Sequence, residues 1–135
     1  MPFTRMRYHI VFSTKGRRPW VTSEIEKFLY PVMGRIAKDM DGHLLQIGGI
    51  EDHVHLLSAI PPSIAVSDFV GGLKSNSSGA IKRHFPWMNQ FQWQEEFSGF
   101  TIGPNDLPRI SRYIQNQKEH HKQDNLIMRF ESRSE

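Results

Sequence analysis

Two apolar runs with only two residues between them constrain the fold more than any other feature of this sequence. The first run covers residues 43–50, the second covers residues 53–60, and Glu51 and Asp52 connect them. Two strand-like runs joined this closely are typical of an antiparallel β-hairpin. The pair of prolines at 61–62 follows directly and cannot continue a hydrogen-bonded strand. We therefore expect a hairpin near the middle of the chain.

Two further strands are predicted, one on each side of the hairpin. Residues 5–14 are strand-like, with Tyr8, Ile10 and Phe12 on one face. His9, Val11 and Ser13 lie on the other face. Residues 97–102 alternate in the same way. A period of two is the signature of a strand with one buried face.

Three stretches carry apolar residues at helical spacing. The first covers about residues 23–40 and contains Pro31, so a kink or a later start is expected there. The second covers about residues 67–85, and its polar middle at 74–79 predicts an irregularity. The third covers about residues 108–122. Residues 86–96 lie between the second helix and the last strand and are expected to form a loop.

The order of these elements is strand, helix, strand, strand, helix, strand, helix. The first six form the β-α-β-β-α-β pattern of a ferredoxin-like (RRM-like) α+β fold, an antiparallel sheet with helices on one face. The last helix is appended and carries Tyr113. A length of 135 residues fits one domain over 1–135, whose tail at 124–135 is a candidate for a mobile segment.

The absence of cysteine limits the chemistry that the chain can perform. It excludes disulfides, thiolate metal sites and a thiol nucleophile. Any metal site must therefore use histidine, carboxylate or amide ligands. No run of about 18 apolar residues occurs, and the N-terminus lacks the apolar core of a signal peptide, so we expect a cytoplasmic protein with no membrane segment.

His53 and His55 form the sharpest local motif. Both lie in the second strand of the hairpin, where residues two apart project from the same face about 6.5–7 Å apart along the strand. Two imidazoles on one rigid strand can form half of a divalent-metal site. The alternative is a pair of half-buried histidines with no ligand.

Tyr113 and Gln117 lie four residues apart in the last helix, which makes them neighbours on one face. A tyrosine phenol with a pKa of about 10 is mostly protonated at neutral pH and needs help to act as a nucleophile. A metal that polarises the attacked phosphate could give that help, and a glutamine carbonyl oxygen is a suitable ligand for a hard metal. The alternative is a tyrosine at the edge of the core beside a solvated glutamine.

Positive charge is concentrated in two segments that contain no acid, although the net charge is only +3. The segments are residues 1–18 and 69–94, and aromatic residues follow in and after the second one. Cations beside aromatic rings suit single-stranded nucleic acid, in which phosphates pair and bases stack. The alternative is a solvated charged face with the aromatic rings in the core. The cations are Arg5, Arg7, Lys15, Arg17, Arg18, Lys74, Lys82 and Arg83, and the aromatic residues are Trp87, Phe91, Trp93 and Phe97.

Taken together, these motifs resemble the single-tyrosine HUH transposases of bacterial insertion sequences and the REP-associated tyrosine transposases. HUH stands for two histidines around a hydrophobic residue. The likeness covers nearly the whole chain. It rests on Tyr8-His9-Ile10-Val11-Phe12-Ser13-Thr14-Lys15 with Gly16-Arg17-Arg18-Pro19, Ile47-Gly48-Gly49, Asp52-His53-Val54-His55-Leu56-Leu57, Val66-Ser67-Asp68, Leu73-Lys74-Ser75, Phe91-Gln92-Trp93-Gln94, and Arg112-Tyr113-Ile114-Gln115-Asn116-Gln117-Lys118-Glu119-His120-His121.

The resemblance implies a specific chemistry. His53, His55 and Gln117 would bind Mg²⁺ or Mn²⁺, and Tyr113 would attack a phosphate of single-stranded DNA next to a hairpin. The products would be a 5′-phosphotyrosine and a free 3′-OH, and the strands would then be rejoined. Relatives act as homodimers, in which the tyrosine can serve the partner's site, or as monomers. Asp52, His120 and His121 are further candidates to support the metal ligands, although a solvated helix end is the alternative for the last two.

Two other functions remain open for such a sequence. One is a non-catalytic relative that only binds DNA hairpins. The other is a histidine–metal phosphodiesterase that uses water as the nucleophile. The joint presence of Tyr113, Gln117 and both histidines favours the transposase.

Overall fold

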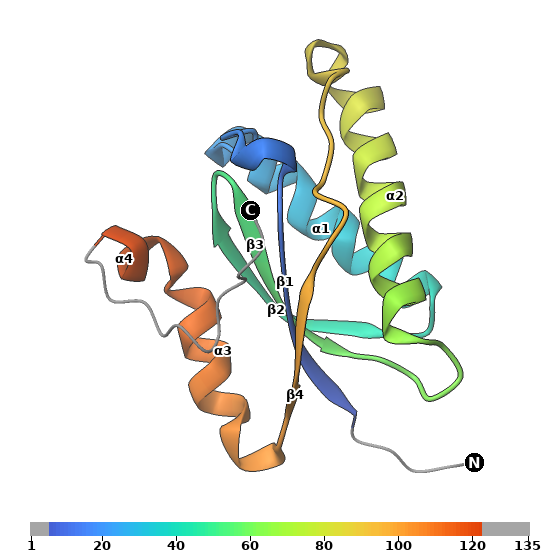
Figure 1. Cartoon of the computed structure of the whole chain (residues 1–135), viewed down its shortest axis with the longest axis vertical. Helices are drawn as coiled ribbons and strands as arrows, with labels where there is room; N and C mark the ends of the chain where they lie inside the picture. The colour runs from blue at the N-terminus through green and yellow to red at the C-terminus, as the bar shows by residue number, and fades with distance from the viewer. Residues whose placement is uncertain (1–5, 123–135) are drawn as a thin grey trace.

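A four-stranded antiparallel sheet forms the centre of the molecule (Figure 1). The computed structural model describes the backbone of residues 6–122 and the side chains of residues 6–119, so Arg5 and the tail 124–135 lie outside the described residues. The strands pair in the order β2-β3-β1-β4, which is the order of a ferredoxin-like sheet. Their bounds are β1 Arg7–Ser13, β2 His43–Ile50, β3 His53–Ala59 and β4 Ser98–Ile102.

The sequence-predicted hairpin is confirmed as β2 and β3, which pair from His43↔Ala59 to Ile50↔His53. β3 also pairs with β1, which places Ser13 opposite His53 and Val11 opposite His55. β1 in turn pairs with β4, so His9 lies opposite Phe100. β1 and β3 are therefore the two inner strands. Their side chains lie at the centre of the sheet and are covered by the helices that pack on each face.

Two helices cover one face of the sheet. They are α1 Ser23–Asp39 and α2 Val66–His84. The main core lies between them and the inward side chains of β1 and β3, which include Ile10, Phe12, Val54 and Leu56. No helix within residues 6–122 is long and apolar enough to cross a membrane.

Both helices run unbroken through the positions at which the sequence predicts a disturbance. α1 begins at Ser23, ahead of Pro31, so the expectation of a later start is wrong. Pro31 is exposed, and the carbonyl group that its ring leaves unpaired can therefore bond to water. α2 runs unbroken through its polar middle, because Ser77 faces the core and accepts a hydrogen bond of 3.0 Å from the Trp93 indole.

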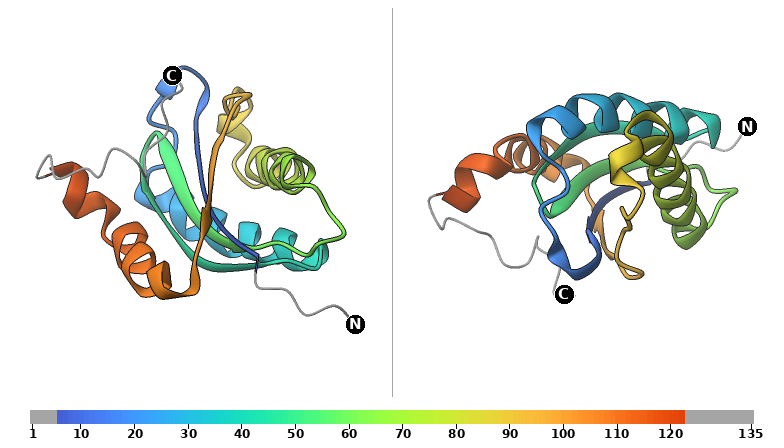
Figure 2. Two further views of the ribbon diagram at one scale, coloured as in Figure 1. Left: turned by 60° about the horizontal axis from the view of Figure 1, so that its bottom comes forward. Right: turned by 90° about the horizontal axis from the view of Figure 1, so that it is seen from above.

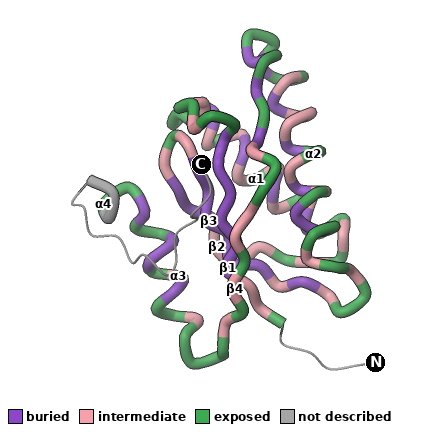
Figure 3. Tube along the Cα trace, viewed as in Figure 1, coloured by how far each residue is buried: buried purple, intermediate pink, exposed green. Residues whose placement is uncertain are grey.

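The C-terminal helices cover the opposite face of the sheet (Figure 2). α3 Leu107–Gln115 packs Ile110, Tyr113 and Ile114 against Leu57 of β3. α4 Gln117–Lys122 follows it. The buried residues Ile110, Tyr113 and Ile114 form one side of α3, and the other side of this helix is exposed (Figure 3). The single helix predicted over 108–122 is therefore two helices, which meet at Asn116, a residue of low helix propensity.

Candidate active site

His53 and His55 project from the face of β3 that α3 covers. Both are almost fully buried, and their ring centroids lie 5.0 Å apart. Val54 between them belongs to the main core on the other face. The strand period therefore brings the two imidazoles together as the sequence predicted.

The Nδ1 atom of each histidine has a hydrogen-bond partner. Nδ1 of His53 lies 2.8 Å from Oδ1 of Asp52. Nδ1 of His55 lies 2.8 Å from Nε2 of His9 on β1. Asp52 also lies 3.7 Å from the Arg17 guanidinium. Fixing one ring nitrogen orients the imidazole and directs the other nitrogen, Nε2, to a ligand.

Tyr113 lies against this histidine pair. Its side chain is only 3% exposed, and its ring centroid lies 5.8 Å from that of His55 and 6.4 Å from that of His9, edge to face in both cases. α3 can approach the sheet this closely because Gly48 of β2 has no side chain. A Cβ atom at Gly48 would overlap the carbonyl oxygen of Ile114, the residue after Tyr113.

Gln117 begins α4 and is 1% exposed. Its side-chain NH₂ donates to the carbonyl oxygen of Tyr113 at 3.4 Å, which leaves the amide oxygen as the atom suited to a metal. Lys118 anchors the start of α4, because its amine donates to Oε2 of Glu26 at 2.6 Å and to the carbonyl of Gly49 at 3.3 Å. Gly49 pairs with Val54, the residue between the two histidines, so Lys118 anchors α4 beside the histidine pair.

The donor set fits a divalent cation of moderate hardness. Two imidazoles, each oriented through Nδ1, lie side by side, and a buried amide lies on the neighbouring helix. Within the part of the chain that the structure describes, no three His, Cys, Asp or Glu residues are grouped as a metal site. Among the described residues, the buried amide of Gln117 is a candidate for a third ligand. Imidazole ligands suit divalent transition metals, and an amide oxygen suits the harder Mg²⁺ and Mn²⁺.

The cations predicted to bind DNA lie in several places. Lys15 and Lys82 line a groove between the loop after β1 and α2, with Glu95 and Glu96 on its far side. Lys15 also lines an adjoining pocket with Arg18. The loop that carries Lys15 is tied to the turn before His53, since Thr14 donates its backbone N–H to the carbonyl of Asp52.

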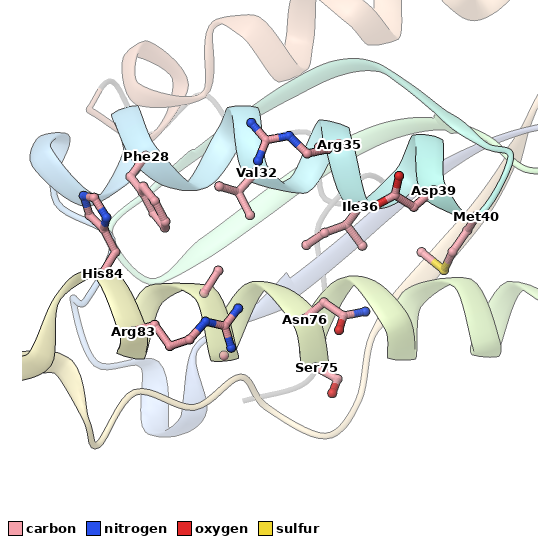
Figure 4. Close-up of a pocket in the computed structure, with 12 residues that line it drawn as sticks. Phe28, Val32, Arg35, Ile36, Asp39, Met40, Ser75, Asn76, Arg83 and His84 are labelled. Carbon is pink, nitrogen blue, oxygen red and sulfur yellow. The ribbon is translucent and has the colours of Figure 1, made fainter.

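Lys74 lines the same groove but binds backbone carbonyls, and Arg17 and Arg83 lie elsewhere. The Lys74 amine is half-buried and donates to the carbonyl oxygens of Gln94 and Glu96 at 2.6 and 2.9 Å. Arg17 lies beside Asp52. Arg83 lies in a separate groove between α1 and α2, together with Arg35, Asp39 and His84 (Figure 4).

The aromatic residues were expected either to stack on DNA bases or to pack in the core, and the structure divides them between these two roles. Phe91 and Trp93 are buried in the main core, so for these two the core alternative is right. Trp87 is 60% exposed and meets the core only at its edge, where its ring lies 5.7 Å from that of Phe85. Phe97 packs against the edge of the core.

Sequence reasoning missed His9. It has no short-range spacing to another candidate, and its contact with His55 spans 46 residues. The signal that could have found it is the strand alternation, which puts His9 on the face opposite Ile10. The side chains of His120 and His121 lie outside the described residues.

Comparison with known proteins places this chain in a family. The model of the IS200-like transposases matches residues 2–117. The chain belongs to this family. This confirms the expected transposase, a DNA-cleaving enzyme.

Individual relatives agree with the assignment. The transposase is 32% identical over 123 residues to the transposase for insertion sequence element IS200 of Salmonella typhimurium, covering 86% of this chain and 79% of that protein. It is 25% identical over 120 residues to the ISDra2 transposase TnpA of Deinococcus radiodurans, covering 85% of this chain and 86% of that one.

Solved structures share the fold. A protein of Deinococcus radiodurans R1, described as a candidate transposase, aligns with a TM-score of 0.72 and 26% identity over 86% of this chain and 93% of its own. The REP-associated tyrosine transposase bound to a REP hairpin aligns with a TM-score of 0.66 over 93% of this chain and 73% of its own. At 14% identity, this second likeness concerns the fold alone.

Proposed function

We propose that this transposase cleaves and rejoins single-stranded DNA next to a hairpin, with Tyr113 as the nucleophile and a divalent metal held by His53, His55 and Gln117. The observation that carries the proposal is the contact between the phenol ring of Tyr113 and the imidazole of His55, at 5.8 Å between centroids. A tyrosine held against two oriented histidines combines a nucleophile with a Lewis-acid site on one face of the sheet.

The covalent step exchanges one phosphate ester for another. The phenolic oxygen of Tyr113 forms a bond to the scissile phosphorus, and the bond from phosphorus to the 3′-oxygen breaks. The phenol proton passes to solvent, and the 3′-oxygen takes up a proton to become a hydroxyl. The 5′-phosphotyrosine keeps a phosphodiester, so a 3′-OH can reverse the step and rejoin strands without a nucleotide cofactor.

The residues around the phosphate have separate roles. A bound Mg²⁺ or Mn²⁺ supplies Lewis-acid stabilisation of the phosphate oxygens and of the leaving 3′-oxygen. Asp52 and His9 orient the two histidines through Nδ1. Arg17 faces the carboxylate of Asp52 and acts on the site through it. Tyr113 is buried, so its phenol has to become exposed when DNA binds.

The DNA strand is proposed to run from the histidines around the end of the sheet at Asp52 and into the groove and the adjoining pocket that Lys15, Arg18 and Lys82 line. Trp87 at the end of α2 is exposed and suits stacking on a base. A neighbour in fold was solved with a REP hairpin, which supports a hairpin next to the cleaved strand. The proposed assembly is a homodimer, in which the tyrosine helix can serve the partner's site. A monomer is the alternative, and the contact of Tyr113 with the histidines within one chain supports it.

The test is a denaturing gel of the protein with a labelled single-stranded hairpin and Mn²⁺. Wild type should give a protein–DNA band that resists denaturation, and Tyr113→Phe should lose both the band and the cleavage product. Removing the metal with EDTA should abolish both as well. Tyr113→Phe removes one oxygen only, so melting curves should show that the variant remains folded.

The other two functions predict different gels. A metal phosphodiesterase that uses water would still cleave as Tyr113→Phe and would never form the covalent band. A hairpin-binding protein without catalysis would shift the DNA on a native gel and leave it intact on the denaturing gel. Either result would overturn the proposed nucleophile.

A further inference from the structure

We propose that His9 is a positioning residue that accepts a hydrogen bond from Nδ1–H of His55 and thereby keeps Nε2 of His55 available to the metal. This inference rests on the proposed function, because it assigns His55 as a ligand. It concerns a residue to which the sequence motifs assign no role, and it extends the site from β3 to the neighbouring strand β1.

The geometry of the two rings supports a direct hydrogen bond. Nε2 of His9 and Nδ1 of His55 lie 2.8 Å apart, within the usual range for such bonds. The rings are stacked at 29° with centroids 5.1 Å apart. Both side chains are 0% exposed, so water does not compete for this contact from the surface. The antiparallel register of β1 and β3 places His9 opposite Leu57, diagonal to His55.

A hydrogen bond between two neutral imidazoles has two possible directions. If Nδ1 of His55 donates, its Nε2 carries a lone pair and can bind a metal. If Nε2 of His9 donates instead, the proton of His55 sits on Nε2 and blocks coordination. A metal at His55 therefore requires His9 to be the acceptor, with its own proton on Nδ1.

His9 is held in place from two sides. Its ring meets the ring of Phe100 on β4 at 5.9 Å and the ring of Tyr113 on α3 at 6.4 Å. One side chain therefore contacts both a proposed metal ligand and the proposed nucleophile. His53 has a different acceptor, the carboxylate of Asp52, so the two ligands are oriented by chemically different groups. Groups that orient metal ligands typically account for about 10–100-fold in metal affinity.

The experiment compares His9→Gln with His9→Leu. The Gln Oε1 lies as many bonds from the backbone as the His Nε2 and can accept the same hydrogen bond, whereas Leu has similar bulk and no acceptor. Mn²⁺ is titrated into each folded protein without DNA, and the free ion is followed by electron paramagnetic resonance. Ile10→Val is the control, because it alters the adjacent residue of β1 on the opposite face.

We expect His9→Leu to weaken Mn²⁺ binding about 10–100-fold and His9→Gln and Ile10→Val to bind close to wild type. Equal affinity of wild type and His9→Leu would overturn the role of His9, as would equal weakening by Gln and Leu. If wild type itself binds no Mn²⁺, the proposed metal site fails, which is a separate result from a failure at His9.

A second measurement needs no variant. Nitrogen-15 chemical shifts and long-range couplings of the imidazole rings report which nitrogen carries the proton. In the metal-free protein we expect His55 to be protonated on Nδ1. A proton on Nε2 of His55 would overturn the inference even if His9→Leu cannot be purified in folded form.

Discussion

Four buried polar residues lie side by side on the face of the sheet under α3. They are His9 and Ser13 on β1 and His53 and His55 on β3, each 2% exposed or less. Burying a polar group costs free energy unless it is hydrogen-bonded, and apolar residues at these positions would pack as Leu57 does nearby. A polar cluster at the centre of a sheet is therefore a sign of chemistry at this face.

Lys74 has a structural role, because its half-buried amine binds the backbone carbonyls of Gln94 and Glu96. Burial lowers the pKa of its amine from the usual 10.5 to about 8, although Glu95 and Glu96 act in the opposite direction. Between these two values the unfolded chain binds more protons than the folded chain. The contribution of Lys74 therefore makes the free energy of unfolding increase with pH across this window.

Lys74→Met keeps most of the aliphatic stem and removes the titrating group. The free energy of unfolding of wild type should rise relative to that of Lys74→Met as the pH increases from about 8 to about 10.5. Below this range the difference between the two proteins should be constant. Urea denaturation at pH 7 and pH 10 measures it. A difference that is the same at both pH values would contradict the burial of this amine.

Among the residues of the candidate site, the sequence predicted those that lie close in the chain to the residues they act with. His53, His55 and Asp52 are within three residues of one another, and Tyr113 is within four of Gln117. His9 was missed because its partner is on another strand, and pairing between strands depends on the whole sheet. The amine of Lys74 could not be placed for the same reason, since it binds carbonyls about 20 residues away.

The position of α3 on the sheet decides where Tyr113 lies. Ile110 and Ile114 pack against Leu57, and Ser111 donates a hydrogen bond of 3.2 Å to the side chain of Gln46 on β2. The break at Asn116 lets α4 turn so that Lys118 reaches both Glu26 on α1 and the backbone of Gly49. These contacts hold the tyrosine helix at both ends.

Gly48 is the position at which this arrangement is most sensitive. Gly48→Ala would drive a methyl group into the backbone of Ile114, and relief of such overpacking costs about 1–3 kcal/mol. We expect a lower melting temperature and a reduced yield of the covalent DNA band, because α3 must move away from the histidines.

Gly71→Ala is the matched control for this substitution. Gly71 lies on the exposed side of α2, where an added Cβ meets nothing within 4 Å. Replacing a helical glycine there should stabilise the protein by up to about 1 kcal/mol and leave DNA cleavage unchanged. If Gly48→Ala behaves like Gly71→Ala, the close contact of α3 with β2 does not position Tyr113.

The elements themselves were mostly predictable from periodicity, and the exceptions have physical reasons. β1 and β4 follow from alternation, and the hairpin follows from two apolar runs with two residues between them. Both are local properties. The polar middle of α2 misled because Ser77 meets a buried indole from residue 93, a contact that no local pattern reveals. The end of α3 at Asn116 was missed because the helical spacing continues past it, while the anchor of α4 lies on other elements.

The whole molecule presents two different faces. One side carries α1 and α2 over the apolar core, and the other carries the C-terminal helices (Figure 2). The histidines and Tyr113 lie on this second side. Lys82 and Arg83 are adjacent in α2 but about 100° apart around its axis. They therefore lie in different grooves, Lys82 with Lys15 and Arg83 with residues of α1.

This adjacency allows a matched test of the proposed DNA path. Lys82→Gln and Arg83→Gln remove the same charge from neighbouring positions. Lys82→Gln should lower the slope of log affinity against log salt by about one unit, the value for one lost phosphate contact, while Arg83→Gln should leave the slope near wild type. Fluorescence anisotropy of a labelled hairpin over a salt series measures both. A larger effect from Arg83→Gln would place the DNA between α1 and α2.

The most direct test of the account is the identification of the residue that carries the DNA. Wild type is allowed to react with the hairpin substrate and Mn²⁺, the DNA is trimmed with nuclease, and tryptic peptides are analysed by mass spectrometry. The chain has three tyrosines, and cleavage after lysine and arginine places them in separate peptides, 8–15, 28–35 and 113–118. We predict a nucleotide phosphate on peptide 113–118 alone. The same adduct on the peptide of Tyr8 or Tyr30, or cleaved DNA with no adduct on any peptide, would contradict the assignment of Tyr113 as the nucleophile.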